Sequence, residues 1–237
     1  MRVTQIAVLG LTLSAIASAE TFDLSPVNYP AIPKFVRTPT DFTPGGWKAV
    51  AIKSGDLNGD RRPDVAVLIQ STDLANVRPR PDSKYRQDDT NPYMVALGVR
   101  ERSGYRLVAV HHKLFPREVA PMHGDDPPSA DTIEISRGVL SLYFGHLRGF
   151  DRFRFRWNGK AFALIGFDCG GAAGGSILGL SANYLTRRAR IERGEVGKDR
   201  SDSWTVRIRP DKRPTLNQID WEYGWIGQDT NGNDLSC

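Results

Sequence analysis

Oxygen-bearing side chains recur at alternate positions of one short segment, Asp56-Leu57-Asn58-Gly59-Asp60-Arg61-Arg62-Pro63-Asp64. Asp56, Asn58, Asp60 and Asp64 stand at positions 1, 3, 5 and 9 of this segment. Calcium binds six to eight oxygen ligands, and a tight loop supplies them from alternate side chains and from a backbone carbonyl at position 7. That carbonyl belongs to Arg62 here. The spacing therefore predicts a Ca²⁺ site made by these five residues.

Two apolar, β-branched runs flank the acidic segment, at Trp47–Ile52 and Val65–Gln70. Such runs predict strands, so we expect the segment to be the loop of a hairpin. An EF-hand would instead place a helix on each side of the loop.

Residues 54–68, Ser-Gly-Asp-Leu-Asn-Gly-Asp-Arg-Arg-Pro-Asp-Val-Ala-Val-Leu, resemble the calcium loop of the FG-GAP (VCBS-like) repeat family, found in integrin α-subunit propellers and many exported bacterial proteins. The resemblance implies a calcium-binding loop between two strands, with side-chain ligands Asp56, Asn58, Asp60 and Asp64 and the carbonyl of Arg62. The family usually has glycine where this chain has Arg61, and a non-glycine residue at positive φ costs free energy. The resemblance covers one motif, and we find no repeat of blade length.

Two other interpretations of acidic segments stay open. Asp, Asn and Gly form turns without any metal, so the loop could be a solvent-exposed β-turn. A second cluster, residues 229–234, repeats the first half of the pattern, but its position 9 falls on Cys237. We expect a flexible polar tail there, with a second metal site as the alternative.

The first residues have the pattern of a secretory signal peptide. Arg2 precedes an apolar run from Ile6 to Ile16, and Ala17-Ser18-Ala19 is a small-residue cleavage site. We therefore expect residues 1–19 to be removed and the protein to be exported, to the periplasm or outside the cell. Removing one arginine and no acid lowers the formal net charge from +5 to +4. This mild excess favours solubility more than nucleic-acid binding, and no further apolar run is long enough to span a membrane.

Export also bears on the two cysteines, because disulfides persist outside the cytoplasm. Cys169 and Cys237 could form one bridge, or Cys169 could be a buried thiol and Cys237 a free terminal one.

The remaining chain predicts an all-β fold, mainly antiparallel, either a β-sandwich or a meander like propeller blades with long polar loops. We expect a proline-rich extended arm over residues 20–46 and a single β domain over residues 47–237. Further predicted strands, several of them paired as hairpins, are Tyr93–Glu101, Tyr105–His111, Thr132–Ser136, Val139–Phe144, Arg152–Trp157, Ala161–Phe167, Leu180–Leu185, Arg188–Glu195 and Ser203–Ile208.

Three segments predict loops. Ser71–Pro92 and Lys113–Asp131 are polar and rich in proline, so they bury little apolar surface. Gly170–Gly175 is glycine-rich and lacks the Lys-Ser/Thr ending of a phosphate-binding loop, so we expect a mobile loop.

Arginines alternate with aromatic residues from Arg152 to Trp157, which predicts that Arg152, Arg154 and Arg156 share one face of a strand. Arg188, Arg190, Arg207 and Arg209 would extend that basic face if their strands are neighbours. A solvated face with acidic partners is the simpler interpretation.

The function that we expect is an exported, calcium-binding β module of non-enzymatic, interaction or structural role, with an unknown protein or anionic glycan as partner. One alternative is an envelope protein that binds a polyanion or glycan through the arginines. Another is a secreted hydrolase with an unrecognised carboxylate site, because the sequence leaves enzymatic activity open although no complete catalytic motif is present. The sequence does not predict an oligomeric state.

Overall fold

The computed structural model describes residues 24, 26–79, 87–115, 117, 127–198, 201–209, 213–219 and 227–235. The expected signal peptide, residues 1–19, lies outside this part of the chain. The predicted fold class is confirmed, because the described residues form antiparallel β-sheets with four short 3₁₀ helices and no α-helix among them. No helix in these ranges is long and apolar enough to cross a bilayer.

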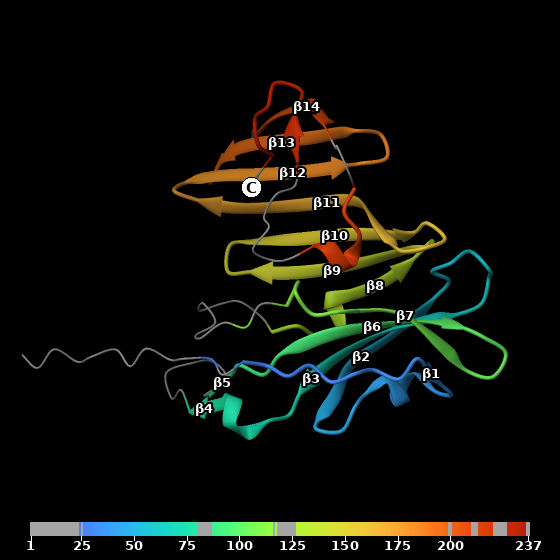
Figure 1. Cartoon of the computed structure of the whole chain (residues 1–237). Helices are drawn as coiled ribbons and strands as arrows, with labels where there is room; N and C mark the ends of the chain where they lie inside the picture. The colour runs from blue at the N-terminus through green and yellow to red at the C-terminus, as the bar shows by residue number, and fades with distance from the viewer. Residues whose placement is uncertain are drawn as a thin grey trace, which may run out of the picture.

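The first half of the chain forms a five-stranded sheet in the order β1-β7-β6-β3-β2 (Figure 1). Its strands are β1 (Phe35–Val36), β2 (Trp47–Gly55), β3 (Asp64–Ser71), β6 (Tyr93–Arg100) and β7 (Tyr105–His111). The strands predicted at Trp47–Ile52, Val65–Gln70, Tyr93–Glu101 and Tyr105–His111 are thus confirmed to within three residues at each end. Every residue of β3 is buried, because both faces of this inner strand are covered.

The second half forms an eight-stranded sheet in which each strand pairs with the next along the chain, stepping away from the first sheet (Figure 1). The strands are β8 (Ile133–Ser136), β9 (Val139–His146), β10 (Gly149–Trp157), β11 (Phe162–Ala173), β12 (Ser176–Asn183), β13 (Arg188–Glu195), β14 (Ser201–Arg209) and β15 (Gln228–Asp229). A tight turn joins β8 to β9. Arg137 and Gly138 both have positive φ, as a two-residue hairpin turn of type I′ requires.

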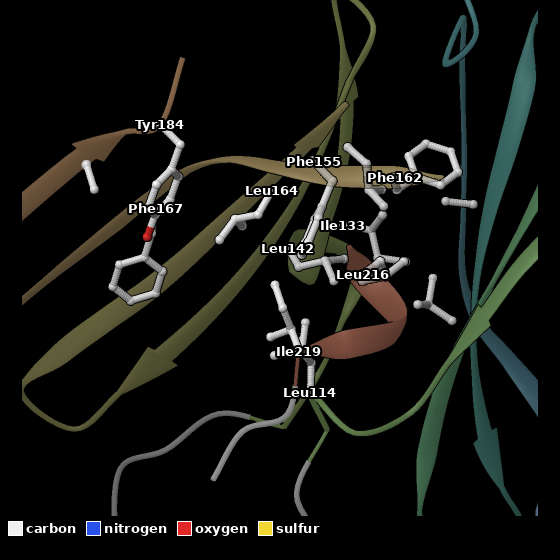
Figure 2. Packing of buried hydrophobic residues seen from close by; sticks show 14 of the residues in the cluster. Leu114, Ile133, Leu142, Phe155, Phe162, Leu164, Phe167, Tyr184, Leu216 and Ile219 are labelled. Carbon is white, nitrogen blue, oxygen red and sulfur yellow. The ribbon is translucent and has the colours of Figure 1, made fainter. Parts of the chain in front are cut away.

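One large core lies between the two sheets (Figure 2). Ala66, Leu68 and Val95 contribute from the five-stranded sheet, and the same cluster continues along the second sheet through Phe155 to Ala189 and Ile208. The short helix η4 (Leu216–Gln218) adds Leu216, and Ile219 follows directly after it; Figure 2 shows both side chains beneath the strands of the second sheet. The two sheets therefore fold around shared apolar side chains.

A smaller core covers the opposite face of the five-stranded sheet, beneath residues of the proline-rich arm. Ile32, Val36 and Phe42 from the arm pack against Val67 and other residues of the sheet. Phe42 belongs to helix η1 (Pro39–Phe42). Its ring packs so closely on Gly98 that a Cβ there would lie 2.6 Å from Phe42 Cε2. Residues 26–46 of the expected arm thus lie on the sheet, to which β1 adds a short edge strand.

Two predicted loops differ from the structure. Within Ser71–Pro92, helix η2 (Leu74–Asn76) and a two-stranded ribbon of β4 (Val77–Pro79) and β5 (Gln87–Asp89) are present, held by Gln70 Nε2 donating to Asp89 Oδ2 at 3.0 Å. Gly170–Gly175 is not a separate loop, because residues 170–173 continue β11 and Gly174-Gly175 makes its hairpin turn with β12. Much of Lys113–Asp131 lies outside the described residues.

Candidate metal-binding loop

The acidic loop, residues 56–63, joins β2 to β3 where the two sheets meet. Gly55, which ends β2, packs against β8 so closely that a Cβ there would lie 2.5 Å from Ile135 Cγ2. Leu57 is 2% exposed and belongs to the large core. The loop is therefore anchored to both sheets through apolar contacts, while its polar side chains face one another.

Asp64 is the most firmly held of the predicted ligands. Its side chain is fully buried at the first residue of β3. Oδ2 accepts hydrogen bonds from the backbone N–H groups of Leu57 at 2.8 Å and Asn58 at 3.2 Å, and Oδ1 accepts from that of Arg100 at 2.7 Å. Burial raises the pKa of Asp64, while the N–H bonds oppose that shift. Asp64 thus ties the loop to β3 and to the end of β6.

Asp56 and Arg61 shape the turn of the loop. Asp56 Oδ1 accepts from Gly59 N at 2.6 Å, and Oδ2 accepts from Arg61 N at 2.8 Å. Arg61 has φ of 65°, which is the left-handed conformation that glycine adopts without strain. The loop therefore keeps the backbone shape expected for glycine at this position, and the arginine bears a cost of about 1–2 kcal/mol.

The middle of the loop is closed by an ion pair. Asp60 Oδ2 accepts from the Arg62 guanidinium, at 3.0 Å from Nε and 2.8 Å from Nη2, and Oδ1 accepts from Arg62 N at 2.9 Å. Asn58 makes two further hydrogen bonds with Asp60: its Oδ1 accepts from Asp60 N at 2.9 Å, and its Nδ2 donates to Asp60 Oδ2 at 3.3 Å. The hydrogen bonds from Arg62 hold the pKa of Asp60 below its usual value.

The donor types fit calcium, but their present positions do not form a closed coordination shell. The described part of the chain contains no group of three or more His, Cys, Asp or Glu side chains placed to hold a metal ion together. Each carboxylate oxygen offers two lone pairs, so an oxygen that accepts one N–H can still coordinate a cation. Two oxygens are exceptions: Arg62 and Asn58 surround Asp60 Oδ2, and Asp64 Oδ2 already accepts from both Leu57 N and Asn58 N. Binding through these two oxygens therefore requires Asp60 to leave the guanidinium and Asp64 to give up a backbone hydrogen bond.

The segment expected to be a polar tail is ordered in the structure. Gln228–Asp229 forms β15 against β14, and Asp229 Oδ1 accepts from Asn231 N at 2.8 Å and Asn233 N at 2.9 Å. The side chain of Asn233 also donates to Asp229 Oδ2, and these bonds lower the pKa of Asp229. Gly232 has φ of 87°, close to the 86° of Gly59 in the first loop. The acidic loop and residues 229–234 therefore resemble each other in the backbone conformation of their turns.

Sequence reasoning missed the contribution of Arg100 and Leu57, whose backbone N–H groups hold Asp64. Spacing carries no signal for such partners, since backbone groups of any residue can donate.

Cys169 is disulfide-bonded in the structure, and the only other cysteine in the sequence, Cys237, lies outside the described residues.

Searches of protein-family models, curated proteins and solved structures found no match to this chain.

Proposed function

We propose that the protein is an exported, non-enzymatic β module whose β2–β3 loop binds one Ca²⁺ ion through Asp56, Asn58, Asp60 and Asp64 and the carbonyl of Arg62. The ion stabilises the junction of the two sheets. The proposal combines the calcium-type spacing of the sequence with the position of the loop.

The observation that carries this proposal is the attachment of one loop to four strands of two sheets. The loop connects β2 to β3, Asp64 bonds to the backbone of Arg100 at the end of β6, and Gly55 packs on Ile135 of β8. Three aspartates lie within nine residues of chain, so a divalent cation offsets the repulsion among them. A cation at this place supports the fold rather than a chemical reaction.

The affinity that we expect is that of an extracellular calcium module, with a dissociation constant of about 10⁻⁴ to 10⁻³ M. Two features of the loop weaken binding. Arg62 must release Asp60, and Arg61 adds a second positive charge next to the ligands. A weak site is sufficient outside the cytoplasm, where calcium is plentiful.

Thermal unfolding of residues 20–237 in calcium, in magnesium and in chelator tests the proposal. Free calcium at ten times the dissociation constant adds roughly 1.4 kcal/mol to the free energy of unfolding. For a chain of 218 residues (237 minus 19) this raises Tm by about 3–6 °C. Magnesium gives a smaller shift, because it keeps its waters and demands octahedral geometry. An equal shift in Asp60→Ala, or none up to about 10 mM calcium, would contradict the proposal.

A further inference from the structure

The outer face of the eight-stranded sheet, which points away from the core, carries arginines on β10, β13 and β14. On β10, Phe155 is fully buried in the core, so the alternation of the strand directs Arg154 and Arg156 outward. Ala189 on β13 and Ile208 on β14 are likewise buried, which places their arginine neighbours on the same outer face. We call this surface the arginine face; it comprises Arg152, Arg154, Arg156, Arg188, Arg190, Arg207 and Arg209.

The strand register aligns these arginines although β10 and β13 are not neighbours. One line of cross-strand partners runs from β9 to β14 through Tyr143, Arg152, Asp168, Ser181, Arg190 and Thr205. The next line runs through Ser141, Arg154, Gly166, Asn183, Arg188 and Arg207. Three strand spacings of about 4.8 Å separate β10 from β13, so positive charges recur about 14 Å apart along each line. The residues between them are small or polar, except for the acidic Asp168.

Arg188 and Arg207 are direct cross-strand partners, and both are exposed. Within the described ranges neither has an acidic partner. Like charges that face each other across two strands repel, so this pair disfavours the hairpin that carries it. An anion that lies across both guanidinium groups removes the repulsion.

Other arginines of the face differ in how far they are neutralised. Arg154 Nη2 bonds to Asp168 Oδ1 at 2.8 Å, and its guanidinium lies over Gly166, where a Cβ would come within 2.7 Å of Nη2. Arg190 lies 3.7 Å from Glu192, which is a loose pair on the surface. Arg154 is thus a fixed part of the sheet, while Arg188, Arg190 and Arg207 keep charge for a ligand.

Two aromatic rings lie beside the first line of arginines. Tyr143 and Phe150 stack with their ring centroids 5.8 Å apart, and the Arg152 guanidinium carbon lies 5.3 Å from the centroid of Tyr143. The ring of Phe150 covers Gly170 of the neighbouring strand, where a Cβ would come within 3.1 Å of its Cε1. Glycine at this position therefore leaves room for the ring beside the neighbouring strand.

We propose that the arginine face binds a linear anionic glycan that carries sulfate or carboxylate groups. Guanidinium groups bind such oxyanions in bidentate fashion, and the exposed parts of the Tyr143 and Phe150 rings offer apolar contact to a sugar ring. An extended face with positive charges on β10, β13 and β14 fits a chain ligand rather than a compact one. Glycans are also anionic chains that an exported protein meets. This inference rests on the export proposed above and does not depend on calcium.

Surface plasmon resonance with immobilised heparin tests the proposal, with residues 20–237 in chelator at about 0.15 M salt. The double variant Arg188→Thr/Arg207→Thr is compared with Arg37→Thr/Arg102→Thr, which removes the same charge from exposed positions beside the five-stranded sheet. We expect about a tenfold loss of affinity in the first variant and little change in the second. Arg152→Thr/Arg190→Thr provides an independent test on the same face, and circular dichroism checks that each variant folds.

Three results would overturn the proposal. Equal losses of affinity in the face variants and in the control would mean that net charge alone governs binding. No heparin binding by the unmodified chain would mean that the arginine face does not bind such a glycan. Tighter binding to single-stranded DNA or to phosphatidylglycerol vesicles than to heparin, at the same salt, would assign the face to another class of partner. Weaker binding to polygalacturonate than to heparin supports the proposal and indicates sulfate as the preferred group.

Discussion

The carboxylate of Asp64 accepts a 2.7 Å hydrogen bond from the backbone N–H of Arg100, 36 residues further along the chain. The same carboxylate accepts from Leu57 N at 2.8 Å. One buried side chain thus joins the acidic loop to the start of β3 and the end of β6. The role is structural whether or not a cation is bound.

Asp64→Asn should lower the free energy of unfolding by about 1–3 kcal/mol. The NH₂ group of asparagine only donates, so the backbone N–H groups bonded to one of the two oxygens of Asp64 lose their acceptor. Chemical denaturation monitored by tryptophan fluorescence measures the loss. Asp73→Asn is the control, since Asp73 caps η2 in an exposed position and Asn caps equally well. Equal effects of the two substitutions would contradict the role of Asp64.

Arg61→Gly should stabilise the protein by up to about 1 kcal/mol. Relief of the left-handed backbone contributes about 1–2 kcal/mol, and the greater freedom of glycine in the unfolded chain offsets about half of it. The same change at Arg102, whose φ is not positive, should destabilise the fold. Denaturation midpoints of both variants check the prediction, and a loss of stability in Arg61→Gly would show that the loop is not strained.

Reduction of the disulfide at Cys169 should destabilise the chain. A bridge to Cys237 closes a loop of 69 residues, counted from 169 to 237. For a loop of this length, chain entropy limits the stabilisation of the fold to about 4 kcal/mol. Thiol titration of the denatured, unreduced protein should detect no free thiol, and thermal unfolding with a reductant should show a lower Tm. Two free thiols would contradict the pairing.

The turn at Asp229 should open at unusually low pH. Hydrogen bonds from Asn233 hold the folded pKa of Asp229 below its ordinary value of 3.8. A lowered folded pKa contributes stability above the unfolded pKa, and that contribution is lost as pH falls through the folded pKa. The amide resonances of Asn231 and Asn233 should therefore titrate in NMR with a midpoint below 3.8. A midpoint at or above that value would mean that these bonds do not form in solution.

The antiparallel strands and the backbone of the acidic loop could be predicted because alternation and turn residues act locally. The expected glycine-like conformation at position 61 is present, with φ of 65°. The ion pair between Arg62 and Asp60 was not predicted, since spacing assigned Arg62 only a carbonyl.

Other features depend on contacts that no local pattern contains. The ribbon of β4 and β5 is held by Gln70 and Asp89, which are 19 residues apart. Gly170 belongs to a strand because it pairs with Phe150 of β10 and Gly179 of β12. The arginines of β10 and β13 align only through the register of the two strands between them. Strand order and register are properties of the whole sheet, so composition could not reveal them.

Calorimetric titration of calcium into chelator-stripped residues 20–237 tests the calcium site most directly. We expect saturation near one equivalent, loss of binding in Asp60→Ala, and about two- to fivefold tighter binding in Arg62→Ala, which keeps the carbonyl and removes the competing guanidinium. No saturable binding up to about 10 mM calcium, or equal binding by Asp60→Ala, would contradict the account and leave the loop as a hydrogen-bonded turn.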